Sequence, residues 1–355
     1  MVACLVNVYY TSSVGGDILA TIRDVAEKAG VSAATVSRIL NNDATLSTSV
    51  ETKERVLQAA KDLKYKKKAK VLTASRYTIG ILQWFSAEQE MEDNYYLMIR
   101  QGIEDYCARH KINIIRAYKT DVNYLQQLDK ADGIICIGKF SKQEVNSIKE
   151  ITNAMVLLDM TTEDSSITTS SLDFDQTVKE VMEYLYGLGH RKIGFLGGKE
   201  FLDDGTLFKD QRINAFCAFC AQHSLDCEKY IAEDRFSVSS GYEMMKKFIE
   251  ADTVPTAVFA ASDPLALGAV HALKEHGYKV PEDVSVVGFD NTNFTNYSDP
   301  PLTTVDAPVY AMGIHSVKMV YDMMRSAFTY PSKMLMPCSL VIRGSCASPK
   351  KEKKK

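Results

Sequence analysis

The feature that most constrains the fold is an alternation of short apolar runs with longer amphipathic runs beyond residue 78. Strands separated by stretches of helical length indicate parallel pairing, because parallel neighbours need a crossover connection. The pattern therefore predicts an α/β fold with parallel sheets. The expected strands cover residues 79–84, 112–118, 133–138, 154–160, 192–198, 256–262 and 284–290, and the clearest expected helices cover 96–110, 176–188, 241–250 and 265–277.

A second pattern occupies residues 21–41, TIRDVAEKAGVSAATVSRILN, and predicts two short helices joined by a tight turn. Thr21 is placed to cap the first helix, with Asp24 completing a capping box. Gly30 is expected to end that helix, since glycine adopts the left-handed conformation without steric cost. Ser32 is expected to cap the second helix.

The second helix places apolar residues inward and leaves small residues, hydroxyls and Arg38 outward. Such a face suits a helix that enters the DNA major groove. The alternative is an ordinary helical hairpin packed in a core, but the caps, the turn and the outward face all agree with the DNA-binding interpretation. A third helix is expected from about residue 49 to 63, with Val56, Leu57, Ala60 and Leu63 on its inner face.

Residues 21–41 closely resemble the N-terminal helix-turn-helix of the LacI/GalR family of transcriptional repressors. Fourteen positions match the pattern T-x-x-D-V-A-x-x-A-G-V-S-x-x-T-V-S-R-x-L-N. The resemblance implies contacts of hydroxyls with DNA phosphates, and of small side chains and Arg38 with base edges. The expected DNA-binding residues are Thr21, Ser32, Ala33, Ala34, Thr35, Ser37, Arg38 and Asn41.

The family's linker is a hinge helix that inserts a leucine into the minor groove, which makes Leu72 a further candidate. The lysine-rich stretch KKKAKVLTASRY at 66–77 departs from that pattern. It lacks the usual Pro or Asn after Tyr65, and it is shorter than common. Its lysines are compatible with a solvated linker or with phosphate contacts.

Residues 79–344 resemble the periplasmic-binding-protein-like core of the same family, through the blocks GLGHRKIGFLGG, ASDPLALGAVHAL, VSVVGFDN and PPLTTV. The resemblance implies two similar α/β subdomains around a sugar-sized cleft. The expected domains are an extension or mis-assigned start (1–20), a helix-turn-helix domain (21–65), a hinge (66–78), an effector-binding and dimerisation core (79–345) and a basic tail (346–355). Within the core, the first subdomain takes about 79–172 and 307–336, and the second about 173–306 and 337–345.

Ligands of parallel sheets bind beyond the carboxyl ends of the strands. The side chains there can bind sugar hydroxyls or offer an aromatic plate. The resemblance adds an arginine and an aromatic residue from other blocks. The expected effector-binding residues are Trp84, Lys139, Asp159, Arg212, Phe236, Ser262 and Asp290; Tyr95 and Tyr96 could line the cleft mouth, and Asp263 is expected to cap the next helix. Similarity to the subgroup of β-galactosidase and galactose operon repressors suggests a galactoside.

Charge is distributed unevenly along the chain. Residues 21–70 carry a net charge of +5, whereas the whole chain of 355 residues carries −3. A basic head on an acidic body suits a regulator that binds DNA with one end. The lone C-x-x-C of Cys217 and Cys220 is expected to be helical and core-facing rather than a metal or redox site, and reduced cysteines fit the cytoplasm.

The sequence therefore predicts a cytoplasmic, dimeric repressor of double-stranded operator DNA, controlled by a small sugar, with no cofactor, no metal and no membrane association. One alternative is an enzyme with an appended helical domain, but no HExxH, P-loop or G-x-S-x-G motif is present. Another is a sugar-transport protein, which needs the same cleft but also an export signal and no DNA-binding head.

Overall fold

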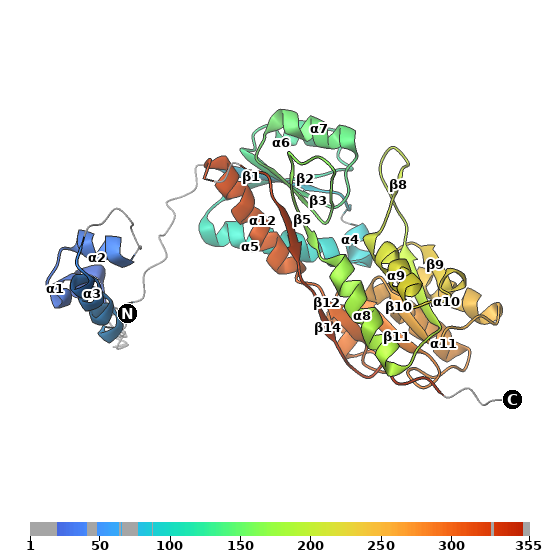
Figure 1. Cartoon of the computed structure of the whole chain (residues 1–355). Coiled ribbons are helices and arrows are strands. Elements are labelled where there is room, and N and C mark those ends of the chain that lie inside the picture. The colour runs from blue at the N-terminus through green and yellow to red at the C-terminus, as the bar shows by residue number, and fades with distance from the viewer. Residues whose placement is uncertain are drawn as a thin grey trace, which may run out of the picture. The chain divides into compact units, whose positions relative to one another are not determined.

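A computed structural model describes residues 20–40, 48–63, 65, 77–86, 88–327 and 330–350. The chain forms two compact units that divide in the sequence after residue 71 (Figure 1). The first is the helical head and the second is the α/β core. Asn41, Leu72 and most of the expected hinge lie outside the described residues.

The head contains three helices, α1 (Ile22–Ala29), α2 (Ala33–Leu40) and α3 (Val50–Asp62). The two caps expected on α1 are confirmed: Thr21 and Asp24 form a reciprocal capping box, and Gly30 ends the helix with a φ of 64°. Small and β-branched side chains fill the centre, where the three helices pack closely against one another. The buried residues are Val25, Ala26, Ala29, Val36, Ile39, Val56 and Ala59.

The inner face of α3 differs from the expectation at one position. Leu57 is 53% exposed, whereas Val56 and Ala59 are buried. A helical turn of 3.6 residues rotates Leu57 by about 100° away from Val56, so the buried stripe follows the spacing of Val56 and Ala59.

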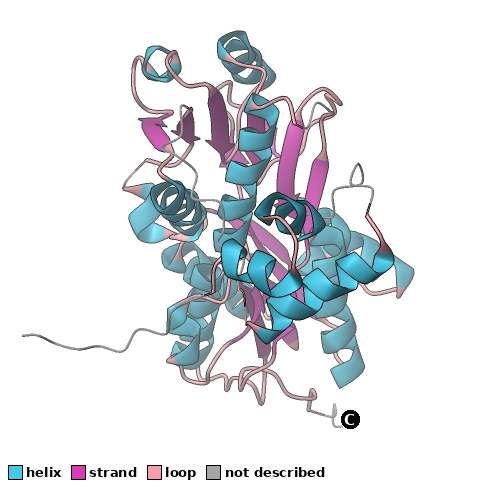
Figure 2. Ribbon diagram, turned by 90° about the vertical axis from the view of Figure 1, so that its left-hand side faces the viewer, coloured by secondary structure: helices cyan, strands magenta, loops and turns pink. Residues whose placement is uncertain are grey.

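Two six-stranded sheets organise the core, and each forms one lobe (Figures 1 and 2). The first sheet has the order β13-β5-β4-β3-β1-β2 and is parallel throughout. Its strands are β1 (Thr78–Gln83), β2 (Asn113–Tyr118), β3 (Gly133–Ile137), β4 (Met155–Leu158), β5 (Thr168–Leu172) and β13 (Lys333–Met336).

The second sheet has the order β14-β12-β11-β10-β6-β9, and only its edge strand β14 is antiparallel. Its strands are β6 (Ile193–Gly198), β9 (Ile231–Asp234), β10 (Ala257–Ala260), β11 (Ser285–Phe289), β12 (Thr303–Asp306) and β14 (Ser339–Val341). A short hairpin, β7 (Glu200–Phe201) and β8 (Leu207–Phe208), follows β6.

Helices cover both faces of the first sheet. Alternate residues of β3 separate into two cores: Ile135 and Ile137 pack toward α5 and α12, whereas Ile134 and Cys136 pack toward α6 and α7. Period-two burial on both faces is the signature of a doubly covered parallel sheet. The helices of this lobe are α4 (Gln89–Glu92), α5 (Tyr95–His110), α6 (Tyr124–Leu128), α7 (Lys142–Ile151) and α12 (Val309–Met324).

The second lobe contains α8 (Phe174–Leu188), α9 (Gln211–Gln222), α10 (Val238–Glu250) and α11 (Asp263–Glu275). Helices α8 and α9 pack together, as do α10 and α11. Glycines lie where the second pair is closest: a Cβ on Gly268 would lie 2.0 Å from the Val238 carbonyl oxygen, and one on Gly241 would lie 2.2 Å from the Leu265 carbonyl oxygen. No larger residue permits that approach.

The chain crosses between the lobes three times, after β5, after β12 and between β13 and β14. These crossings bring β13 and β14 to the edges of different sheets although only two residues separate them. The carboxyl ends of the strands in the two sheets flank the region where the lobes meet, which places a binding site there.

Candidate functional site

The first candidate site is the outward face of α2 in the head. Ser32 caps the helix by accepting a hydrogen bond from the Thr35 backbone N–H at 3.1 Å. Ser32, Ala34 and Arg38 are exposed, and Thr35 and Ser37 are half-buried. Ala33 is also half-buried and packs against the small core, so its methyl group faces outward less than expected. The structure thus presents small and hydroxyl side chains beside an exposed arginine.

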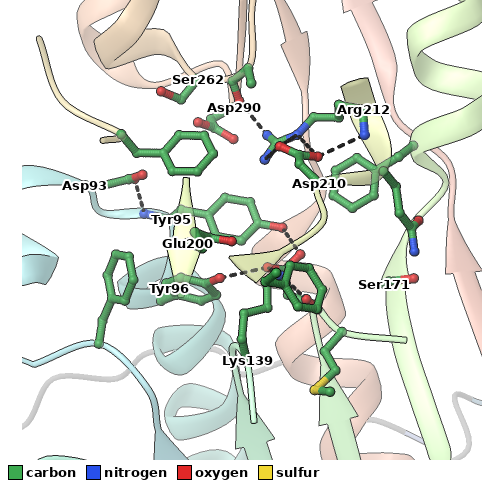
Figure 3. Close-up of a pocket in the computed structure, with 18 of the residues that line it drawn as sticks. Asp93, Tyr95, Tyr96, Lys139, Ser171, Glu200, Asp210, Arg212, Ser262 and Asp290 are labelled. Carbon is green, nitrogen blue, oxygen red and sulfur yellow. Dashed lines mark hydrogen bonds and ion pairs between the residues drawn. The ribbon is translucent and has the colours of Figure 1, made fainter. Parts of the chain in front are cut away.

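The second candidate site is a cavity between the two lobes of the core (Figure 3). Six of the seven expected effector residues line it, although they come from six separate chain segments. These are Lys139, Asp159, Arg212, Phe236, Ser262 and Asp290. Tyr95 and Tyr96, which were expected at the mouth of the cleft, also line it. The structure adds further side chains: Phe85, Asp93, Phe174, Glu200, Phe208, Asp210 and Gln211.

Arg212 lies near the start of α9 and is held on one side by Asp210. Its Nε lies 2.9 Å from both Asp210 carboxylate oxygens, and its Nη1 donates to the Ala261 carbonyl. Burial disfavours the charged guanidinium, but the Asp210 carboxylate outweighs it and raises the pKa of Arg212. The ring centroids of Phe174, Phe236 and Phe289 lie 5.1–5.3 Å from the guanidinium carbon. Arg212 is therefore fixed as a cation within an aromatic enclosure.

A second polar cluster centres on Asp159 at the end of β4. The Lys139 ammonium lies 2.5 Å from one Asp159 carboxylate oxygen and also contacts its backbone carbonyl. The hydroxyls of Tyr95 and Tyr96 donate to the same carboxylate at 3.0 and 2.8 Å (Figure 3). Asp159 has a φ of 60°, a conformation that non-glycine residues adopt only when their surroundings hold them there.

Burial raises the pKa of three further carboxyl groups in the cavity. Burial raises the pKa of Glu200 to about 7. Burial, reinforced by Asp93 and Asp263, holds the pKa of Asp290 well above its usual range. Burial also raises the pKa of Asp93. Neutral carboxyl groups can both donate and accept hydrogen bonds, as the hydroxyls of a neutral ligand require.

Two expectations at the strand ends need correction. Trp84 does not line this cavity; it packs against Phe85 and Tyr96 with ring centroids 5.1 and 6.0 Å away, and it lines an adjoining hollow. Asp263 does not cap α11, because Ser262 is the capping residue. Asp263 instead accepts hydrogen bonds from the Thr292 N–H and the Thr304 hydroxyl, which tie β12 and the loop after β11 to α11.

Sequence reasoning missed Glu200, Asp93, Asp210 and Phe208. The first and last belong to the β7–β8 hairpin, whose two-residue strands carry no periodic signal. Asp93 lies in the short segment between α4 and α5. Only Asp210 carried a usable signal, since it precedes the Arg212 block as an N-cap residue.

The described residues include no group of three or more His, Cys, Asp or Glu side chains arranged to hold a metal ion. Seven cysteines fall within the described ranges, and all of them are free thiols. In the same part of the chain, no helix combines the length and the apolarity needed to cross a membrane.

Two family models match the chain. Residues 21–68 match the bacterial regulatory proteins of the lacI family, and residues 182–346 match the periplasmic binding protein-like domain. The regulator GalR of Streptococcus thermophilus is 32% identical over 92% of this chain and 99% of its own length. The repressor MelR of Bacillus subtilis is 33% identical over 93% of this chain and 98% of its own.

Solved structures show the same fold. The cellobiose complex of the transcriptional regulator CelR has a TM-score of 0.67 at 22% identity, covering 92% of this chain and 99% of that one. The lac repressor dimer bound to operator and an anti-inducer has a TM-score of 0.66 at 23% identity, with 93% and 99% covered. A LacI family regulator from Enterococcus faecium with bound ribose has a TM-score of 0.65 at 25% identity, with 76% and 99% covered.

The capped helix-turn-helix, the two-lobed parallel core and nearly full-length relatives above 30% identity lead to one conclusion. This chain belongs to the lacI family of bacterial regulatory proteins and is a DNA-binding transcriptional regulator rather than an enzyme.

Proposed function

We propose that this regulator is a cytoplasmic repressor of a sugar-utilisation operon and that a small neutral saccharide in the interlobe cavity controls its binding to operator DNA. The observation that carries the proposal is the cavity itself. Carboxyl, ammonium and phenol groups alternate there with aromatic rings, the combination that binds hydroxyl groups and the apolar face of a sugar ring.

The charges in the cavity favour a neutral saccharide over a sugar phosphate. Arg212 and Lys139 are already paired, at 2.8 Å with Asp210 and at 2.5 Å with Asp159. The other three acidic groups, Asp93, Glu200 and Asp290, add negative charge if ionised and none if protonated. A phosphate would therefore meet no surplus cation among the lining residues, and desolvating it there would be costly.

We assign ligand contacts to Lys139, Asp159, Arg212, Phe236, Ser262 and Asp290, and we take a galactoside as the first candidate. Asp290 supports this assignment, because a raised pKa lets its carboxyl group donate to a sugar oxygen. The ribose bound by the Enterococcus faecium relative supports a sugar in this fold.

A ligand can enter the cavity only if the two lobes move apart. The cavity leaves only about 40 Å³ open, whereas sites for small molecules span about 300–1,000 Å³. A saccharide must therefore enter with the lobes farther apart, and its hydroxyls would replace internal partners such as Asp210. A ligand that binds the two lobe arrangements with different affinity shifts their populations, and this difference is what operator binding would sense.

On the DNA side, we propose phosphate contacts from Ser32, Thr35 and Ser37, and base contacts from Ala34 and Arg38. Thr21, Ala33, Asn41 and Leu72 complete the proposed DNA-binding set. Two copies of the chain would read the halves of a pseudo-palindrome, since a symmetric dimer matches a symmetric operator. The domains of this scheme are 21–65 for the head, 66–78 for the hinge and 79–345 for the core.

The test is operator binding measured by fluorescence anisotropy on a family-type palindromic duplex. D-galactose, D-glucose, melibiose, cellobiose and D-galactose 6-phosphate would be added in turn. We expect specific binding that a neutral saccharide changes and the phosphate does not. A response only to the phosphate would overturn the neutral-ligand proposal, and failure of every sugar to alter binding would overturn control by saccharides.

A further inference from the structure

A second hollow adjoins the interlobe cavity. Its lining includes the aromatic side chains of Trp84 and Phe201 and the charged side chains of Glu88, Lys199 and Arg235. Four of its other lining residues, Phe85, Asp93, Glu200 and Phe236, also line the cavity, so the two spaces share a wall. In Figure 3 this wall includes Asp93, on the opposite side of the view from Ser171.

The hollow differs from the cavity in size. Its volume is about 480 Å³, against about 40 Å³ in the cavity. The larger volume lies within the range of sites that hold whole small molecules. The hollow is therefore large enough to hold a sugar ring beside the cavity.

The lining is chemically suited to such rings. The aromatic side chains of Trp84, Phe85 and Phe201 supply flat apolar surfaces. Phe201 is 55% exposed at the start of the β7–β8 hairpin, so its ring is accessible to a ligand at the mouth. Aromatic rings beside a few polar groups are what a site for a polyhydroxylated ring requires.

The polar groups of the hollow are available to a ligand. Within the described part of the chain, the side chains of Glu88, Lys199 and Arg235 take part in no hydrogen bond or ion pair, and all three are exposed. They present both acceptors and donors, so the hollow matches hydroxyl groups rather than a ligand of one charge.

We propose that this hollow is a second saccharide subsite and that the effector is an oligosaccharide of two or more rings. One terminal ring would lie in the interlobe cavity and the next would stack on Phe201. This inference rests on the proposed function and refines it from a small sugar to an extended one. The β7–β8 hairpin would then contact both rings, through Glu200 in the cavity and Phe201 in the hollow.

The test is calorimetric titration of the full-length protein with two matched series: D-galactose, melibiose and raffinose, and D-glucose, cellobiose and cellotriose. Phe201→Ala is the test variant. Phe294→Ala is the control, because Phe294 is also exposed, at 71%, but lines neither space. In one of the two series, galactose-based or glucose-based, we expect the wild type to bind the longer sugars more tightly than the monosaccharide. Phe201→Ala should weaken only the longer sugars, by roughly threefold to tenfold.

Equal affinity across each series, or an equal loss for every sugar length in Phe201→Ala, would overturn the second subsite while leaving sugar control intact. Absence of binding by all six sugars would overturn the subsite together with the proposed function. A loss confined to the longer sugars, absent in Phe294→Ala, would support it.

Discussion

The head and the core differ in how far apart in the sequence their functional residues lie. The head derives its fold and its candidate DNA surface from about forty consecutive residues, and its caps and core are local. The cavity of the core is assembled from segments that lie up to about 200 residues apart, such as Asp93 and Asp290. The comparison teaches that the DNA function is contained in a local motif, whereas the sensing function exists only in the complete tertiary fold.

The largest expected effect tests whether sensing can be removed without harming DNA binding. Arg212→Ala should abolish the effector response, with a loss of roughly 3 kcal/mol or about a hundredfold in ligand affinity, since a buried charged hydrogen-bonding group is lost. Operator affinity without ligand should not change. Calorimetry and anisotropy on the same preparation measure both, and a normal response in this variant would remove Arg212 from the site.

The converse change tests whether DNA binding can be removed without harming sensing. Arg38→Ala should cost roughly 1–3 kcal/mol of specific operator binding, because the exposed guanidinium is the strongest hydrogen-bond donor on the outward face of α2. Ligand affinity and thermal unfolding should match those of the wild type. Unaltered affinity for the operator would contradict the proposed docking of α2.

The independence of the two folds can be tested by stability. Val56→Ala removes two buried carbons from a small core in which Val56 is fully buried. We expect the free energy of unfolding of the head to fall by about 2 kcal/mol. Differential scanning calorimetry should show a lower transition for the head and an unchanged one for the core. Equal shifts of both transitions would mean that the two units unfold together.

Between pH 4.5 and 7, a pH effect on stability should belong to the core. Burial raises the pKa of Glu200 from 4.5 to about 7, so the folded core binds a proton that the unfolded chain has lost between those values. This contribution to stability is fully present below pH 4.5 and is lost as the pH rises through 7. Glu200→Gln should make the decline in core melting temperature over that window shallower. Glu163→Gln, at an exposed position, is the control and should leave the slope as it is.

The smallest effect concerns the surface of the head. Lys28 and Asp62 join α1 to α3 at 3.0 Å, but both side chains are about 40% exposed. Lys28→Met should lower the free energy of unfolding of the head far less than Val56→Ala does, since solvent screens an exposed ion pair. A loss as large as that of Val56→Ala would show that this pair, and not the apolar core, holds the three helices together.

The sequence predicted the head nearly completely because each of its signals is local. The capping box of Thr21 and Asp24, the turn at Gly30 and the cap at Ser32 each follow from residues within one helical turn. Only the orientation of Leu57 and the burial of Ala33 were misjudged. Both errors concern packing against a neighbouring helix, which local pattern does not specify.

In the core, strands rich in Ile, Val and Leu were found and polar ones were missed. All five residues of β5, TTSSL, are buried, but four of them are hydroxyl-bearing. Strand β12 begins with two buried threonines. Backbone pairing within the sheet stabilises such strands, so hydrophobicity alone does not reveal them. Sequence reasoning located the cavity residues that lie at strand ends. It did not locate the hairpin that supplies Glu200 and Phe208.

The three crossings between lobes have a consequence for biosynthesis. The ribosome delivers residues in order, and neither six-stranded sheet has all its strands until β13 and β14 have emerged. The head needs only the first sixty or so residues for its three helices. During translation, the nascent chain therefore holds a complete DNA-binding motif long before it can form a sensing cavity. A ribosome that stalls before residue 333 would leave a head without a ligand-controlled core.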